Sequence, residues 1–173
     1  MGRVRTIPNL LTLLRIFLLP FIVVSIIRGH YGMALFLFLL SSVTDFLDGF
    51  IARRSGSVTS LGILLDPIAD KLLTSSTLIS LASVKLCDPY SVIAIVGREE
   101  AVTGMRAIAA TRGTVIPASS GGKLKTVLIM ASITMILLGF QPWGELLLIL
   151  SAFVALYTGA LYFYRFLKEL KEN

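Results

Sequence analysis

Residues 31–52 have the sequence YGMALFLFLLSSVTDFLDGFIA, an apolar stretch whose only charged residues are Asp45 and Asp48. The stretch contains about the twenty residues that a helix needs to cross the hydrocarbon core of a membrane. Five similar stretches occupy most of the remaining chain, at roughly 7–27, 61–84, 91–111, 124–141 and 143–164. The sequence therefore predicts an all-α, polytopic integral membrane protein with six transmembrane helices, organised as a single domain over residues 1–173.

The composition supports a location in the membrane. Hydrophobic residues make up 55% of the 173 residues, charged residues make up only 15%, and the mean hydropathy is +0.87. These values exclude an intrinsically disordered chain and a secreted soluble fold. The net charge of +6 suits contact with anionic lipid headgroups and a phosphorylated substrate, so we expect membrane lipids and no nucleic acid as partners.

Basic residues are distributed unevenly among the connections between the stretches. The N-terminal tail and the second, fourth and C-terminal connections carry ten of them: Arg3, Arg5, Arg53, Arg54, Arg112, Lys123, Lys125, Arg165, Lys168 and Lys171. The opposite side carries Arg28 and Lys85. The positive-inside rule therefore predicts cytoplasmic termini, and we interpret Lys125, Lys168 and Lys171 as topology signals and headgroup contacts. The aromatic residues of the last stretch are expected to be interfacial anchors: Trp143, Tyr157, Tyr162 and Tyr164.

Four aspartates are predicted to lie at one depth, near the cytoplasmic side. Asp45 follows fourteen uncharged residues from the outer end of its stretch, about 21 Å of helix, and thirteen uncharged residues, about 20 Å, separate Lys71 and Asp70 from the outer end of the next. Asp48 and Asp66 continue the same helix faces at spacings of three and four residues. We expect the third helix to begin near Ile63, which would place Pro67 in its first turn.

Clustered carboxylates within a membrane span repel one another strongly unless cations neutralise them. No His or Cys lies near them in the sequence, and oxygen ligands alone favour Mg²⁺, Mn²⁺ or Ca²⁺. Four carboxylates are enough for two ions, and paired ions are used by enzymes to clamp a diphosphate during displacement. The cluster therefore predicts a divalent metal centre.

These aspartates belong to a longer pattern. Asp45, Asp48, Gly49, Ala52 and Arg53, followed by Gly62, Asp66 and Asp70, resemble the complete motif of the CDP-alcohol phosphotransferases, which are integral membrane enzymes of phospholipid synthesis. Residues 7–15, 97–106 and 118–126 are similar to segments of the bacterial phosphatidylglycerophosphate synthases within that family. The resemblance implies transfer of the phosphatidyl group from CDP-diacylglycerol to sn-glycerol 3-phosphate, with release of CMP. It also implies a homodimer in the bacterial inner membrane whose active site faces the cytoplasm.

The resemblance assigns roles to individual residues. Asp45 and Asp66 would bridge two Mg²⁺ or Mn²⁺ ions, Asp48 would complete one site, and Asp70 would complete the other and act as the base. The CDP-lipid would be held by a set of small and polar residues: Asn9, Thr12, Gly49, Arg53, Thr59 and Gly62.

The phosphate of the acceptor requires cations, for which the candidates are Arg106, Lys123 and Arg165. Arg98 and Glu99 are adjacent in the sequence, and a structural pair between them is one interpretation.

Three other functions remain open at this point. The same motif serves other acceptors; the cations disfavour serine and choline but do not separate inositol phosphate from glycerol phosphate. A membrane prenyltransferase also binds diphosphate through Asp-rich motifs, although these usually occur on two well-separated segments of a longer chain. A membrane cation transporter would explain intramembrane carboxylates, although no acidic residue continues a path through the outer half of any stretch.

Overall fold

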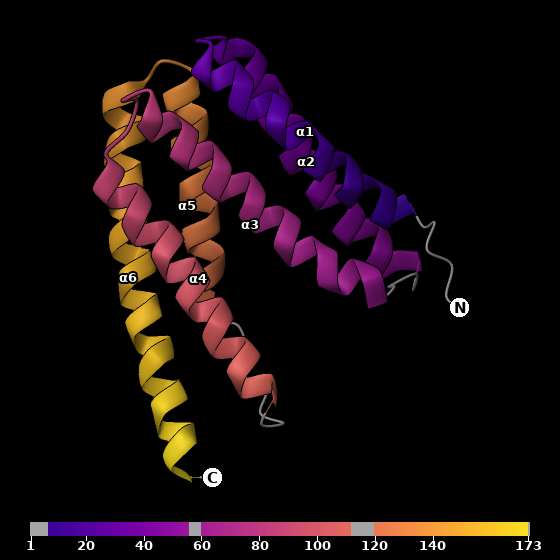
Figure 1. Ribbon diagram of the computed structural model, residues 1–173, viewed down its shortest axis with the longest axis vertical. Helices are drawn as coiled ribbons and strands as arrows, with labels where there is room; N and C mark the ends of the chain where they lie inside the picture. Colours follow the sequence, from indigo (N-terminus) through magenta and orange to yellow (C-terminus); the bar gives the residue numbers. More distant parts are fainter. Residues whose placement is uncertain (1–6, 56–59, 112–119, 173) are drawn as a thin grey trace. The chain divides into compact units, whose positions relative to one another are not determined.

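The computed structural model describes residues 7–55, 60–111 and 120–172, and these residues form six α-helices and no strands (Figure 1). The helices are α1 (Ile7–Ile27), α2 (Tyr31–Ser55), α3 (Ser60–Ser83), α4 (Pro89–Thr111), α5 (Ser120–Leu137) and α6 (Gln141–Glu172). The all-α class is confirmed, and each helix overlaps one of the six predicted apolar stretches. Six membrane crossings and cytoplasmic termini stay predictions.

Several expected helix boundaries are wrong, and two of them involve a proline or a glycine. α3 begins at Ser60, so Pro67 lies beyond the first turn and removes a hydrogen bond to the carbonyl of Ile63. α5 ends at Leu137 rather than continuing to Gln141, because Gly139 adopts a left-handed conformation with φ of 86°. Hydropathy alone does not detect the end of α5, since apolar side chains continue past it at Leu138 and Phe140.

Three helices end in the same way. The amides of His30, Leu86 and Phe140 each donate to a carbonyl five residues earlier, at 2.8, 2.9 and 2.9 Å. The residue before each of these has a positive φ, and it is a glycine in two cases and Lys85, with φ of 59°, in the third. This hydrogen-bond pattern satisfies carbonyls that would otherwise lack a partner at the helix end.

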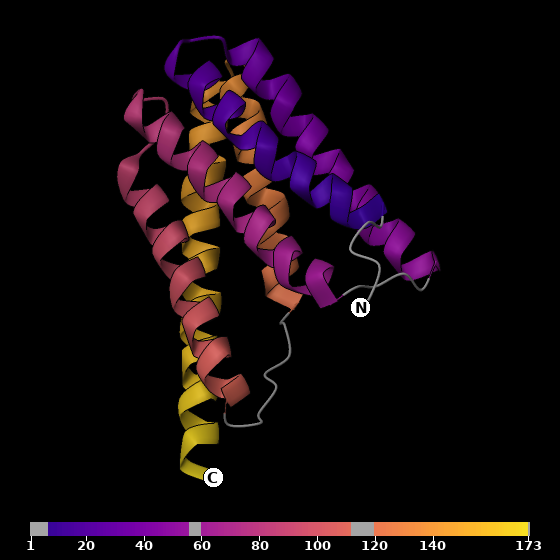
Figure 2. The ribbon, with the colours of Figure 1, turned by 45° about the vertical axis from the view of Figure 1, so that its right-hand side comes forward.

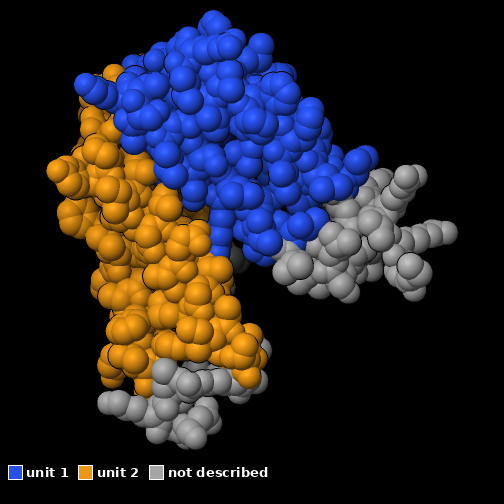
Figure 3. Space-filling view, in the orientation of Figure 1, with its two compact units in different colours: residues 1–86, 137–139 blue, residues 87–136, 140–173 orange. Residues whose placement is uncertain are grey.

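The chain divides into two compact units (Figure 3). Unit 1 comprises Met1–Leu86 with Leu137–Gly139, and unit 2 comprises Cys87–Ile136 with Phe140–Asn173. The predicted metal ligands belong to unit 1, and the predicted acceptor cations belong to unit 2. The expectation of a single domain stays a prediction.

Unit 1 is built around α1, which packs against both α2 and α3. Figures 1 and 2 show α1 and α2 side by side in both views. The apolar interior of this unit is fully or almost fully buried and includes Ile22, Ile26, Phe38, Leu73 and Leu78. In the N-terminal half of α1 the buried positions become polar, with Thr12 and Arg15 both 0% exposed.

Unit 2 is organised by contacts of α6 with α4 and α5. A buried cluster joins α4 to α6 and contains Val102, Ala109, Tyr162 and Phe166, with Met105 packed against it. The hydroxyl of Ser132 on α5 donates to the carbonyl of Gly144 on α6 at 2.9 Å. A Cβ atom at Gly144 would lie 2.6 Å from Cγ1 of Ile136, so only glycine permits this close approach of α5 and α6.

Large apolar side chains cover much of the surface of both units. On α1 alone, Leu10, Phe17 and Ile27 are each more than half exposed. Among the described residues, Leu10–Ile27 and Gln141–Lys168 are long and apolar enough to cross a membrane, judged by length and composition. Apolar exposure on this scale is unfavourable in water and favourable in lipid.

Candidate active site

Asp45 lies on α2 and pairs with a buried cation on α1. The Nη1 atom of Arg15 is 2.6 Å from Oδ1 of Asp45, and the side chain of Arg15 is 0% exposed while that of Asp45 is 37% exposed. A guanidinium removed from water needs anionic or polar partners, because desolvation of a charge is costly. The ion pair with Arg15 therefore holds one oxygen of Asp45, while part of the carboxylate stays exposed on the surface.

Asp66 lies on α3 and receives a hydrogen bond from the same helix. The hydroxyl of Thr12 donates to Oδ1 of Asp66 at 2.6 Å, and Thr12 is fully buried. Thr12 was expected to contact the CDP-lipid; the structure gives it this hydrogen bond to Asp66, and the lipid contact stays a prediction. Thr12 and Arg15 are one turn apart on α1, so a single helix supports carboxylates from two others.

Asp70 follows Asp66 by four residues and is half-buried. Its backbone carbonyl accepts a hydrogen bond from the hydroxyl of Thr74 at 3.1 Å. The i, i+4 spacing on α3 places Asp66 and Asp70 on one face of the helix, as predicted. Asp70 thus occupies the next turn of α3 from the carboxylate that Thr12 holds.

Three of the four predicted metal ligands have side chains within the described part of the chain. Asp45, Asp66 and Asp70 have described side chains, whereas that of Asp48 lies outside the described residues. Among the described side chains, no group of three or more His, Cys, Asp or Glu is arranged to hold a metal ion. The donor chemistry fits Mg²⁺ or Mn²⁺, because every candidate ligand is a carboxylate oxygen. The metal centre at these four aspartates stays a prediction.

Several other predicted site residues cannot be placed beyond their helix. Asn9, Gly49, Arg53, Gly62 and Lys123 lie within helices, but their side chains are outside the described residues. Thr59 lies outside the described residues altogether. Their roles stay predictions.

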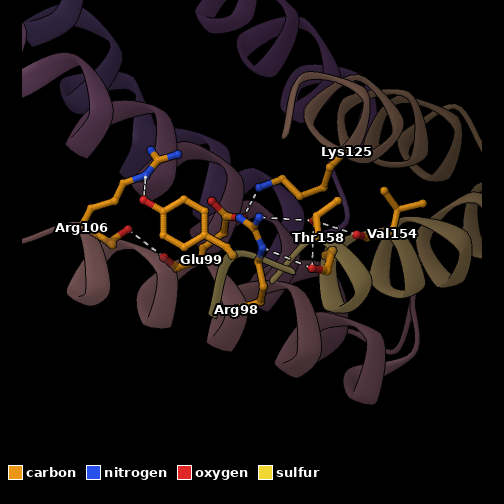
Figure 4. Close-up of polar contacts among 9 residues, drawn as sticks. Arg98, Glu99, Arg106, Lys125, Val154 and Thr158 are labelled. Carbon is orange, nitrogen blue, oxygen red and sulfur yellow. Dashed lines mark hydrogen bonds and ion pairs between the residues drawn. The ribbon is translucent and has the colours of Figure 1, made fainter. Parts of the chain in front are cut away.

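In unit 2, a charged cluster joins α4, α5 and α6 (Figure 4). Nη1 of Arg98 donates to Oε1 of Glu99 at 2.8 Å, and Nζ of Lys125 pairs with the same oxygen. Arg98 also bonds α6, through Nε to the carbonyl of Ala155 at 3.2 Å and through Nη2 to the hydroxyl of Thr158 at 3.3 Å. The predicted pairing of Arg98 with Glu99 is confirmed, and the cluster has a formal charge of +1.

The cluster depends on a glycine in α6. A Cβ atom at Gly159 would lie 2.8 Å from Cγ of Arg98, so the absence of a side chain there makes room for the arginine stem. The interpretation of Lys125 as a headgroup contact is wrong, because Lys125 is only 5% exposed and is paired inside the unit. Its partner on α4 is far away in the sequence, and hydropathy gives no signal of that contact.

Arg106 lies on α4 at the edge of the same unit. Its Nε donates to the hydroxyl of Tyr162 at 3.3 Å, and its Cζ lies 5.3 Å from the centroid of the Tyr162 ring (Figure 4). Tyr162 is only 5% exposed, so its interpretation as an interfacial anchor is wrong, whereas Tyr157 and Tyr164 are more than two-thirds exposed. Arg165, the third acceptor candidate, is exposed on α6.

The sequence predicted no site role for Arg15, and it predicted for Tyr162 only the interfacial position that its burial contradicts. The signal for Arg15 was its position three residues after Thr12 and six after Asn9, which marks a polar side on an otherwise apolar helix. For Tyr162 no such signal exists, because its neighbours in sequence are also aromatic and apolar. Both residues act through a partner on another helix.

Comparison with known proteins gives a consistent result. A model of the CDP-alcohol phosphatidyltransferase family matches residues 5–159, so the chain belongs to this family. Members of the family are generally dependent on divalent metal ions. Together with the two long apolar helices, this membership indicates a membrane protein.

Individual relatives match over most of their length. A protein of Rickettsia felis named CDP-diacylglycerol–glycerol-3-phosphate 3-phosphatidyltransferase is 35% identical, with 92% of this chain and 94% of the relative covered. A Bacillus subtilis protein of the same name is also 35% identical, with 96% and 98% covered. A probable phosphatidylglycerophosphate synthase of Mycobacterium tuberculosis is 39% identical, with 72% and 62% covered.

Proposed function

We propose that this member of the family transfers the phosphatidyl group from CDP-diacylglycerol to sn-glycerol 3-phosphate, giving phosphatidylglycerol phosphate and CMP. The observation that carries the proposal is full-length similarity, over 92% and 96% of the chain, to two proteins named for this reaction. The complete motif from Asp45 to Asp70 supports the same conclusion.

Two Mg²⁺ or Mn²⁺ ions would be held by Asp45, Asp48, Asp66 and Asp70. When bound, such ions neutralise charge on the diphosphate and on the departing CMP. The contacts of Arg15 with Asp45 and of Thr12 with Asp66 support this role, because ligating carboxylates are commonly held by neighbouring hydrogen bonds. We therefore assign Thr12 to support of Asp66, and we keep Thr12, Asn9, Gly49, Arg53, Thr59 and Gly62 as contacts of the CDP-lipid.

Asp70 would accept the proton from the attacking hydroxyl of the acceptor. The hydroxyl oxygen then bonds to the phosphorus that carries the diacylglycerol, and the bond from this phosphorus to the bridging oxygen breaks, releasing CMP. Arg106, Lys123 and Arg165 would bind the phosphate of the acceptor, arginine through two parallel N–H donors and lysine as a point charge.

The setting of this reaction is also a proposal. Six membrane-spanning helices, cytoplasmic termini and an active site on the cytoplasmic side of the bacterial inner membrane agree with the excess of Lys and Arg on one side. At that depth the lipid tails of the donor stay in the bilayer while the polar acceptor enters from water. A homodimer follows from the resemblance alone.

Release of CMP tests the proposed reaction directly. Purified protein in detergent is supplied with CDP-diacylglycerol and Mg²⁺ or Mn²⁺, and receives glycerol 3-phosphate or inositol phosphate in parallel. Release with glycerol 3-phosphate alone supports the proposal, whereas release with inositol phosphate alone keeps the reaction class and overturns the acceptor. Release with neither acceptor overturns the reaction, and cation flux in liposomes would then favour a transporter.

Replacement of the proposed base gives a sharper test. Asp70→Asn keeps the size of the side chain but cannot accept the proton, so we expect turnover to fall by about 10²- to 10⁴-fold. Binding of CDP-diacylglycerol, measured by isothermal titration, should stay detectable. Full activity of Asp70→Asn would rule out Asp70 as the base, and Glu100→Gln, an exposed carboxylate on α4, serves as the control.

A further inference from the structure

Tyr162 combines an almost complete burial of its ring with a polar contact to an exposed cation. The ring packs in the cluster with Val102, Ala109 and Phe166, which joins α4 to α6. At the edge of that cluster its hydroxyl accepts a hydrogen bond from Nε of Arg106. Because neighbours from two helices surround the ring, Tyr162 is a fixed point against which Arg106 is held.

The contact with Tyr162 leaves the two Nη groups of Arg106 available to bind an anion. Arg106 uses Nε for Tyr162, and its side chain is exposed. Among the described residues, no hydrogen bond or ion pair engages the two Nη atoms, and Figure 4 shows them at the free end of the side chain. Two Nη groups in one plane suit the oxygens of a phosphate.

The ring adds a second restraint to the same guanidinium. Its centroid lies 5.3 Å from Cζ of Arg106, which is within the range of a cation–π contact. A hydrogen bond at one edge and a ring beside the plane together restrict rotation of a long side chain. An arginine restricted before binding loses less conformational freedom when it contacts an anion.

We propose that Tyr162 is a positioning residue that orients Arg106 to bind the phosphate of the acceptor. The inference rests on the proposed function, because it takes Arg106 to be an acceptor contact. Tyr162 itself does not touch the acceptor; its effect passes through the Nε hydrogen bond and the ring contact.

Steady-state kinetics of Tyr162→Phe tests this role. Phenylalanine keeps the ring in the buried cluster and removes only the hydroxyl that accepts from Arg106. We expect the KM for glycerol 3-phosphate to rise by about three- to ten-fold, with kcat and the KM for CDP-diacylglycerol unchanged. Tyr164→Phe removes a hydroxyl from an exposed tyrosine of the same helix and should leave all three constants unchanged.

Arg106→Ala, alone and combined with Tyr162→Phe, separates the inference from the proposed function. We expect Arg106→Ala to raise the KM for the acceptor and Tyr162→Phe to add nothing further in that background. Additive effects, or no effect of Tyr162→Phe beside a clear effect of Arg106→Ala, overturn the positioning role and keep the acceptor contact. An unchanged KM in Arg106→Ala overturns both. A fall in kcat, or an equal rise of both KM values, in Tyr162→Phe indicates a structural role and also overturns the inference.

Discussion

Arg15 is the one charged residue of α1, and its side chain has no exposed surface. Its pairing with Asp45 joins α1 to α2, and Thr12, one turn away, joins α1 to α3. Carboxylates that gather to bind metal repel one another before the metal arrives, and a buried arginine beneath one of them reduces that repulsion. At the scale of the residue, two of the proposed metal ligands are thus each held by one particular side chain of α1, Asp45 by Arg15 and Asp66 by Thr12.

The coupling between Arg15 and Asp45 is measurable in a double-mutant cycle. Arg15→Met and Asp45→Asn should each lower thermal stability, and together they should lower it by less than the sum, because both remove the same ion pair. Since Asp45 is partly exposed, we expect a coupling free energy of only about 1 kcal/mol. Thermal unfolding in detergent gives the four values.

A second cycle provides the control for this pair. Arg28 also belongs to unit 1, is exposed and lies beyond the other end of α1 from Arg15. Arg28→Met combined with Asp45→Asn should be additive. Equal coupling in both cycles would show that net charge, rather than the contact of Arg15 with Asp45, determines the effect.

At the scale of the element, helix ends are determined by chemistry that hydropathy does not record. α4 begins after Asp88, whose carboxylate accepts hydrogen bonds from the backbone amide and the hydroxyl of Ser91 at 2.7 and 2.8 Å. Pro89 occupies the first position of the helix, where no amide donor is needed. These hydrogen bonds from Ser91 hold the pKa of Asp88 below its ordinary value of 3.8.

The stability contributed by this cap depends on pH. A folded-state pKa below the unfolded one stabilises the fold above the unfolded pKa, and the effect disappears as the pH falls through the folded pKa. We therefore expect Asp88→Ala to lower the melting temperature by a few degrees at neutral pH, and the difference from the native chain to become smaller in acid well below 3.8, where only a neutral acceptor remains. Thermal unfolding as a function of pH gives both values.

Two variants identify the cause of that change. Asp88→Asn retains an oxygen acceptor for Ser91 without the charge, so it should recover much of the stability at neutral pH and remove the pH dependence. Glu100→Ala removes the same charge from an exposed position on α4. An equal loss in Glu100→Ala and Asp88→Ala would assign the effect to charge alone and contradict the cap.

The sequence predicted where helices lie better than where they end. α1 matches its predicted stretch from residue 7 to 27, because Arg28 and Gly29 interrupt hydropathy and helix together. α6 continues to Glu172, well past the apolar stretch, since Leu, Lys and Glu near its end are good helix formers without being apolar throughout. Side-chain partners were less predictable. The contacts of Arg15, Lys125 and Tyr162 depend on the rotation of one helix against another, which periodicity within one helix does not determine.

At the scale of the whole molecule, the distribution of basic residues predicts the orientation of the chain in the membrane. Lys125 is buried within unit 2, so it no longer counts as a signal at the membrane surface. Removing it from the ten basic residues of the predicted cytoplasmic side leaves nine, against Arg28 and Lys85 on the other side. The asymmetry therefore persists after the structural correction, and the predicted orientation does not depend on Lys125.

Labelling of introduced cysteines tests this orientation, and the native cysteine hardly interferes. Cys87 is only 6% exposed, and burial together with the nearby Glu145 and Asp88 raises its pKa to about 11. Because maleimides react with the thiolate, Cys87 should stay unlabelled at neutral pH even though its loop is predicted to face outward. Labelling of the native chain, which carries Cys87 alone, would contradict that burial. The new cysteines would then be introduced into the Cys87→Ser variant.

Three exposed positions at helix ends report the two sides of the membrane. His30 and Phe140 follow α1 and α5 on the predicted outer side, and Thr111 ends α4 on the predicted cytoplasmic side. The cells are treated so that the outer membrane admits a maleimide that cannot cross the inner membrane. His30→Cys and Phe140→Cys should then be labelled, whereas Thr111→Cys should be labelled only after the inner membrane is lysed. The opposite pattern would invert the protein and place Asp45, Asp66 and Asp70 away from the cytoplasm, where a cytoplasmic phosphorylated acceptor does not reach them. Labelling of His30→Cys without Phe140→Cys would contradict six crossings, because α1 and α5 could not then end on the same side.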